Sequence, residues 1–126
     1  MRERSRMRRV DEALKEVVSE GLRELKDPRI GFVTVTGVKA TNDLSEAVVY
    51  VSVLGSERAR RQTLDALASA HGVLQARVNR ELHFRRTPRL SFQYDPTVER
   101  GVRLGKLIDE LTDGGLEAGR RGDQDA

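Results

Sequence analysis

Cysteine and tryptophan are absent from the 126 residues, and aromatic residues make up only 4% of the chain. The lack of cysteine excludes disulfides and thiolate metal sites and favours a reducing compartment. So few aromatic rings exclude base stacking as the main contact with a nucleic acid. No apolar run approaches the roughly 20 residues of a membrane span, and the N-terminus lacks the apolar core of a signal peptide. We therefore expect a cytoplasmic protein that binds no membrane.

Residues that carry catalysis or bind cofactors are also scarce. The two histidines, His71 and His83, and the scattered carboxylates show no metal-ligand spacing. Neither a nucleophile paired with a base nor a phosphate-binding loop of the form GxxxxGK[ST] is present. The sequence thus predicts a protein that is not an enzyme and that uses no metal, no other cofactor and no small-molecule substrate.

Positive charge is concentrated in two segments. Residues 1–10 hold five arginines against Glu3, and residues 73–89 hold five against Glu81, so each segment carries +4 although the whole chain carries only +3. Such an uneven distribution is typical of a nucleic-acid-binding surface. A merely solvated, arginine-rich surface is the simpler alternative. The arginines that we expect to contact RNA phosphates are Arg6, Arg8, Arg9, Arg77, Arg80, Arg85 and Arg86.

The first half of the chain reads as a helix followed by a β-hairpin. An apolar stripe from Val10 to Leu25 predicts an amphipathic helix, which Asp27-Pro28 should end because the residue before proline disfavours the helical conformation. Alternating β-formers then predict a strand over residues 30–40. Its alternation changes phase at Gly37, as a bulge would require. Residues 47–53 predict the hairpin partner.

The stretch from Leu64 to Leu82 reads as a helix that is broken in the middle. Glycine costs a helix about 1 kcal/mol, so Gly72 predicts a break at His71-Gly72. A third strand over 90–94 and a last helix over 95–111 follow. The expected buried face of the broken helix consists of Leu64, Leu67, Ala68, His71, Leu74 and Val78.

The order of elements predicts one α+β domain in which a small sheet carries helices on one face. The 37% hydrophobic content suits a single modest core. We expect residues 1–9 to be a basic N-terminal segment and residues 10–111 to be the domain. Residues 112–126 are rich in glycine and charge and are expected to be a disordered tail.

Five features of the sequence, taken together and in their order along the chain, resemble the bacterial ribosome-binding factor A family over about residues 5 to 111. They are the element order itself, the Ala70-His71-Gly72 break, DPRIGFVTVTGV at the start of the sheet, DLSEAVVYVS in the second strand and PRLSFQYDP in the third. The resemblance implies a type II KH-like domain with a three-stranded mixed sheet. In it, an Ala-x-Gly helix-kink-helix stands where RNA-binding KH domains carry a Gly-x-x-Gly loop.

The resemblance also implies a function. Members of this family assist late maturation of the small (30S) ribosomal subunit, including processing of its immature 16S rRNA, and serve adaptation to cold. We therefore expect the 30S subunit and 16S rRNA as partners of a monomer, with Ala70, His71 and Gly72 added to the RNA contacts. Two alternatives stay open: Gly72 as a packing kink without a ligand, and His71 as a satisfied interior histidine.

A second function of another class is also open. The outer face of the predicted hairpin, around Val48, Tyr50 and Ser52, would suit a protein-interaction module in which the basic segments are incidental. Salt dependence separates the two functions, because binding through phosphates weakens steeply with salt.

Overall fold

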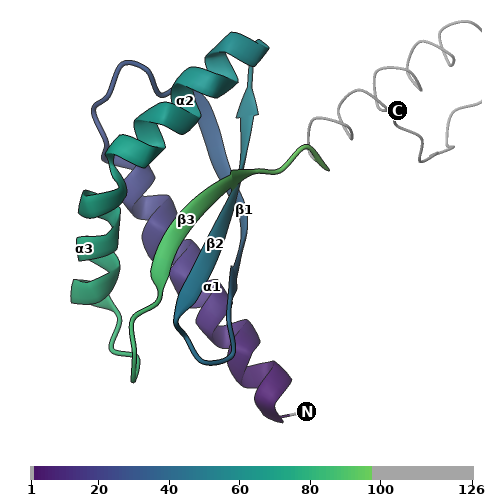
Figure 1. Ribbon diagram of the computed structural model, residues 1–126, viewed down its shortest axis with the longest axis vertical. Coiled ribbons are helices and arrows are strands. Elements are labelled where there is room, and N and C mark those ends of the chain that lie inside the picture. Colours follow the sequence, from purple (N-terminus) through teal and green to yellow (C-terminus); the bar gives the residue numbers. More distant parts are fainter. Residues whose placement is uncertain (1, 98–126) are drawn as a thin grey trace, which may run out of the picture. The chain divides into compact units, whose positions relative to one another are not determined.

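A computed structural model describes residues 2–97, so the predicted tail and all but the start of the predicted last helix lie outside the described residues. Residues up to Tyr94 form one compact unit. Its elements, shown in Figure 1, are α1 (Arg2–Arg23), β1 (Phe32–Ala40), β2 (Glu46–Leu54), α2 (Glu57–Ser69), α3 (His71–Glu81) and β3 (Arg89–Tyr94).

The three strands form a mixed sheet in the order β1-β2-β3. The β1 and β2 strands are antiparallel, as the predicted hairpin requires, and β3 runs parallel to β2. The register shifts between Val35 and Gly37, where Thr36 is the extra residue. This confirms the predicted bulge, which keeps Val35 and Val38 on the same, buried side of β1.

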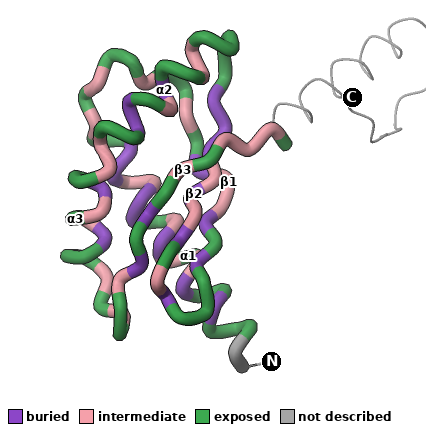
Figure 2. The backbone as a smooth tube through the Cα atoms, in the orientation of Figure 1, coloured by how far each residue is buried: buried purple, intermediate pink, exposed green. Residues whose placement is uncertain are grey.

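The helices α1, α2 and α3 contribute to a single core on one face of the sheet. Alternate residues of the central strand β2, namely Ala47, Val49 and Val51, are fully buried and belong to one cluster with Leu14 of α1 and Leu67 of α2. Figure 2 shows the buried positions where the helices meet the sheet. The predicted α+β class, with helices on one face of a three-stranded sheet, is confirmed.

The first helix begins earlier than the sequence predicted. It starts at Arg2 rather than at Val10, so the basic N-terminal segment is continuous with it. Met7 and Val10 are buried in the core cluster together with Leu14. These three lie at intervals of three and four residues, so Met7 extends the apolar stripe by one turn and supports a helical segment that is otherwise polar.

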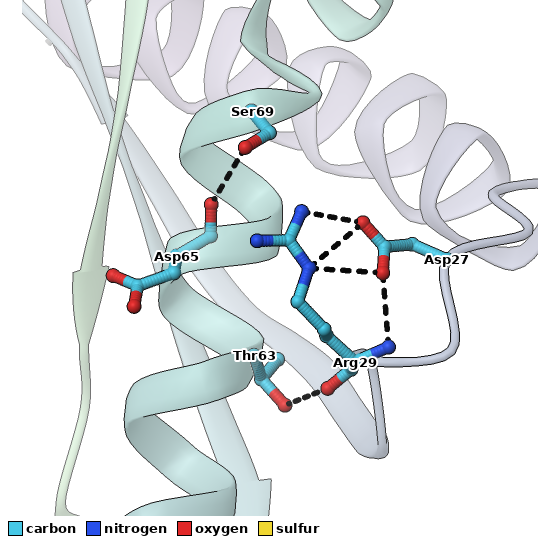
Figure 3. Close-up of polar contacts among 5 residues, drawn as sticks. All are labelled: Asp27, Arg29, Thr63, Asp65 and Ser69. Carbon is cyan, nitrogen blue, oxygen red and sulfur yellow. Dashed lines mark hydrogen bonds and ion pairs between the residues drawn. The ribbon is translucent and has the colours of Figure 1, made fainter.

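The first helix also ends earlier, at Arg23, because the loop after it has its own hydrogen bonds. Asp27 Oδ1 accepts a bond of 2.9 Å from the backbone N–H of Arg29, and Asp27 Oδ2 lies 2.7 Å from Nη2 of the Arg29 guanidinium. These bonds lower the pKa of the Asp27 carboxyl. The buried hydroxyl of Thr63 in α2 donates to the Arg29 carbonyl at 3.3 Å (Figure 3), which ties the loop to that helix.

The second helix starts at Glu57, because the Ser56 side chain accepts a bond of 3.1 Å from the N–H of Ala59 and caps it. The break after it falls at Ala70, which is the first residue of the predicted Ala70-His71-Gly72 break, and not at His71-Gly72. Ala70 ends α2 and precedes α3, with φ −89° and ψ 6°, which lies in the sparsely populated bridge region and does not require a glycine. Gly72 lies in the first turn of α3, and a Cβ added there would meet no atom within 4 Å.

Replacing Gly72 by alanine is therefore expected to stabilise the protein by up to about 1 kcal/mol, since alanine is the better helix former and has room. Chemical denaturation of both proteins measures the change. A loss of stability would show that the glycine is needed for the kink, as its sequence position suggested.

Candidate nucleic-acid interface

One end of the domain gathers arginines from distant parts of the sequence. The start of α1, the β1–β2 turn and the α3–β3 connection all lie at this end (Figure 1). A hollow of about 320 Å³ opens between them. We call it the arginine hollow, and it is lined by Arg6, Asn42, Asp43, Leu44, Arg85 and Arg86.

The β1–β2 turn that borders the arginine hollow is held by hydrogen bonds to a single carboxylate. Asp43 Oδ1 accepts bonds of 2.8 Å from both the Thr41 and the Ser45 hydroxyl groups, and one of 3.0 Å from the Ser45 backbone N–H. Because all three donors stabilise the ionised form, the Thr41 and Ser45 bonds, with a smaller contribution from Arg86, lower the pKa of Asp43 to about 2.

The low pKa of Asp43 makes the turn sensitive to acid. Its ordinary value is 3.8, so the stabilisation from the ionised group is present above about pH 4 and is lost as the pH falls through about 2. We expect the Asp43 carboxyl carbon to titrate in NMR spectra with a midpoint near 2. A midpoint near 3.8 would show that the three hydrogen bonds are not maintained in solution.

Arg85 and Arg86 are exposed, and the Asp43 carboxylate does not pair with either of them. Arg86 Nη1 donates at 3.4 Å to the backbone carbonyl of Asp43, which is a neutral acceptor. Within the described part of the chain, no carboxylate lies within ion-pair distance of Arg85 or Arg86. Both guanidinium groups thus keep their charge available for an anion.

Arg77 differs from the sequence prediction, which expected it to contact RNA phosphates as Arg80 does. Its side chain is only 17% exposed. Arg77 Nη1 lies 2.6 Å from Glu24 Oε1, Nη2 lies 3.6 Å from Glu20 Oε1, and Nε lies 3.1 Å from Glu81 Oε2 at an angle that forms no hydrogen bond. Arg77 therefore joins α3 to α1, and its charge is already compensated.

The electrostatics of Glu24 agree with this structural role of Arg77. The hydrogen bond and the charge of the Arg77 guanidinium lower the pKa of the Glu24 carboxyl, and the same contact raises the pKa of Arg77. Glu20 lies in the last turn of α1, and Glu24 directly follows the end of this helix at Arg23. Arg80, in the last turn of α3, is exposed and remains available for a phosphate.

The kink residues lie away from the arginine hollow. An α3 of 11 residues is about 16 Å long, and Ala70, His71 and Gly72 lie at its start, whereas Arg85 and Arg86 follow its end. His71 Nε2 is hydrogen-bonded to the carbonyl of Leu90 in β3 at 2.8 Å. His71 is therefore a half-buried, satisfied histidine, which was one of the two alternatives.

The sequence-predicted RNA residues thus fall into separate groups. The structure brings Arg6 together with Arg85 and Arg86, places the exposed Arg8 and Arg9 on the same first turns of α1 as Arg6, and withdraws Arg77 into an ion-pair cluster. The turn residues of the hollow were missed, because the residues between the two predicted hairpin strands show no binding motif. No local signal places a hairpin turn beside a loop about 40 residues away.

Metal ligation and membrane insertion have no structural counterpart in residues 2–97. No group of three or more histidine, aspartate or glutamate side chains there is arranged to hold a metal ion. None of the helices in the same range has the length and apolar character needed to cross a membrane.

The fold and the arginine-rich end define a small α+β binding domain, and comparison with known proteins identifies its family. The sequence profile of ribosome-binding factor A matches residues 6–108. Ribosome-binding factor A of Geobacter metallireducens is 45% identical over 104 residues, which are 82% of this chain and 88% of that protein. The chain belongs to the ribosome-binding factor A family.

Solved structures agree with this assignment. The crystal structure of ribosome-binding factor A from Thermus thermophilus is 33% identical, with a TM-score of 0.63 over 70% of this chain and 93% of that one. A Thermus thermophilus homology model fitted into the cryo-EM map of a complex with 30S is 34% identical, with a TM-score of 0.57 over 68% of this chain and 90% of that one.

Proposed function

We propose that this chain is a ribosome assembly factor that binds the small (30S) ribosomal subunit and its immature 16S rRNA. It holds the RNA in one conformation during late maturation and processing, and it leaves when the subunit is finished. The protein acts by occupancy, without catalysis, as a cytoplasmic monomer. The proposal extends to adaptation to cold, which the resemblance to the family implies.

One observation carries the choice of partner, namely the likeness to a Thermus thermophilus factor fitted into the map of a 30S complex. The arginine-rich end supports RNA as the contacted component. Arg85 and Arg86 are exposed and have no carboxylate partner within the described residues. A guanidinium group can donate two parallel N–H bonds to two oxygens of one phosphate. Arg77 is not part of the proposed RNA surface.

Sedimentation of cell extract containing the tagged protein tests the proposal. We expect the protein to sediment with small subunits that contain immature 16S rRNA and to be depleted from mature subunits. The protein should dissociate as salt is raised, because each neutralised phosphate adds about 0.7 to 0.9 to the slope of log affinity against log salt. Recovery only at the top of the gradient, at low salt, would overturn the proposal.

A protein-interaction module remains the second candidate, because the open face of the sheet carries an exposed apolar pair. Phe32 and Leu54 are register partners at one end of β1 and β2 and are 80% and 55% exposed. Val48 and Tyr50 on this face are half-buried, and Ser52 is buried rather than available. Subunit binding that is insensitive to salt and is lost on replacing Phe32 by serine would favour this candidate.

A further inference from the structure

We infer that the arginine hollow is a seat for one phosphate group of an RNA chain together with its ribose. The inference rests on the proposed function for the nature of the ligand. It goes further in assigning the contact to a defined site, formed by Arg6 of α1, the β1–β2 turn, and Arg85 and Arg86 of the α3–β3 connection. The kink at Ala70 lies outside it.

The turn gives the arginine hollow a fixed wall. Leu44 has a φ of 57°, in the left-handed region that a leucine rarely adopts, and its side chain is buried in the core cluster. The Leu44 N–H donates to the Thr41 carbonyl at 2.9 Å, and the Thr41 N–H donates to the Glu46 carbonyl at 2.9 Å. A strained conformation that persists under this many restraints indicates a preorganised segment.

The lining of the arginine hollow carries more positive than negative charge. Arg85 and Arg86 have no carboxylate partner within residues 2–97, and the Asp43 carboxylate is the acidic group of the lining. Asp43 Oδ1 already accepts hydrogen bonds from the Thr41 and Ser45 hydroxyl groups. Arg86 donates to the neutral backbone carbonyl of Asp43, which orients its guanidinium group. A guanidinium held in this way keeps N–H groups for a second acceptor, and phosphate offers oxygens that match the fork.

The volume of the arginine hollow limits the size of the chemical group that can lie in it. Small-molecule sites span about 300 to 1,000 Å³, so 320 Å³ lies at the lower limit of that range. A space of this volume accommodates a phosphate and its sugar, and the rest of an RNA chain would lie outside it. The side chains of the lining include no aromatic ring, so a base has nothing to stack on and the backbone is the part that fits.

Titration of the full-length, isotope-labelled protein with inorganic phosphate at constant ionic strength tests the assignment by NMR. We expect saturable shifts of the amides of residues 42–44 and 85–86 that chloride does not produce. The double variant Arg85→Ala and Arg86→Ala should weaken this binding by about tenfold or more, since charge-assisted bonds are lost. Arg85→Lys with Arg86→Lys keeps the charge without the fork and should restore only part of it.

A matched control removes two other arginines. Arg58 and Arg61 are exposed on the first turns of α2, so Arg58→Ala with Arg61→Ala changes the net charge equally and should leave the phosphate shifts intact. Equal weakening by the two double variants would mean that anions associate with the surface in general, which overturns the inference. Shifts that are absent at residues 42–44 would overturn it as well.

Two RNA oligonucleotides of one sequence, with a 5′-phosphate and with a 5′-hydroxyl group, identify the source of the phosphate. Tighter binding of the first that depends on Arg85 and Arg86 assigns a terminal phosphate, and equal binding with the same dependence assigns an internal one. This inference is overturned, and the proposed function stands, if the wild type shows no local phosphate shifts and the Arg85→Ala and Arg86→Ala variant still binds small subunits normally. Loss of subunit binding in the wild type would instead contradict the proposed function.

Discussion

Replacing Leu74 by alanine is expected to lower the free energy of unfolding by about 2 to 5 kcal/mol, the range for large-to-small changes in a packed core. Leu74 is only 1% exposed and is part of the single core cluster. It lies one turn into α3, where the helix passes α1. The alanine variant would leave a cavity that neither helix can close without moving.

Denaturation by urea or guanidinium chloride, with the slope checked for two-state behaviour, measures the effect. The neighbouring Val73 is 63% exposed and serves as the control. Val73→Ala should stay within about 0.5 kcal/mol of the wild type. A change of similar size in both variants would mean that α3 is not anchored by its buried stripe.

The sequence predicted most of the fold because apolar periodicity reports burial directly. Leu67, Leu74 and Val78 were expected on the buried face and are fully buried. The bulge at Gly37 was visible for the same reason, since the apolar positions change phase there. The antiparallel pairing of β1 with β2 followed from two alternating runs that lie close together in the chain.

Three local predictions failed where a tertiary contact or a backbone detail decided the outcome. The start of α1 depends on the burial of Met7, a single apolar residue among arginines. The break between α2 and α3 occurs at Ala70, although propensity pointed to Gly72. Ala68 was expected on the buried face and is exposed, because the buried face of α2 is formed by Thr63, Ala66 and Leu67 instead.

The candidate site was only partly predictable, because charge alone does not show which arginines have partners. Arg77 and Arg85 belong to the same basic segment of the sequence. Arg77 meets Glu20 and Glu24, which are more than 50 residues earlier, whereas Arg85 lies beside a turn. Only the packing of α3 on α1 distinguishes the arginine that stabilises the fold from the one that faces a ligand.

The same packing links the fold to the proposed RNA surface. Arg77 fixes α3 against α1, and α1 also carries Arg6 at its other end. The position of the α3–β3 connection relative to Arg6 therefore depends on how closely these two helices approach. A change at the helix contact is expected to alter the arginine hollow without replacing any residue that lines it.

Gly21 of α1 lies in this contact between α1 and α3. A Cβ on Gly21 would lie 2.7 Å from Leu74 Cδ2 and 3.2 Å from Arg77 Cδ, both shorter than a relaxed contact. Leu74 is buried, so its methyl group has no solvent to move into. Gly21→Ala should therefore destabilise the protein by about 1 to 3 kcal/mol, the usual effect of overpacking, although alanine favours the helix by about 1 kcal/mol.

A double-mutant cycle tests whether the clash with Leu74 causes the loss. When Leu74→Ala removes the methyl group, adding Gly21→Ala should destabilise the protein much less than it does in the wild type, with a coupling energy of about 0.5 to 3 kcal/mol. Gly72→Ala is the matched control, because the same substitution in open space should stabilise. Additive effects of Gly21→Ala and Leu74→Ala would show that α1 and α3 are not in close contact, and that the helix packing does not set the position of the arginines.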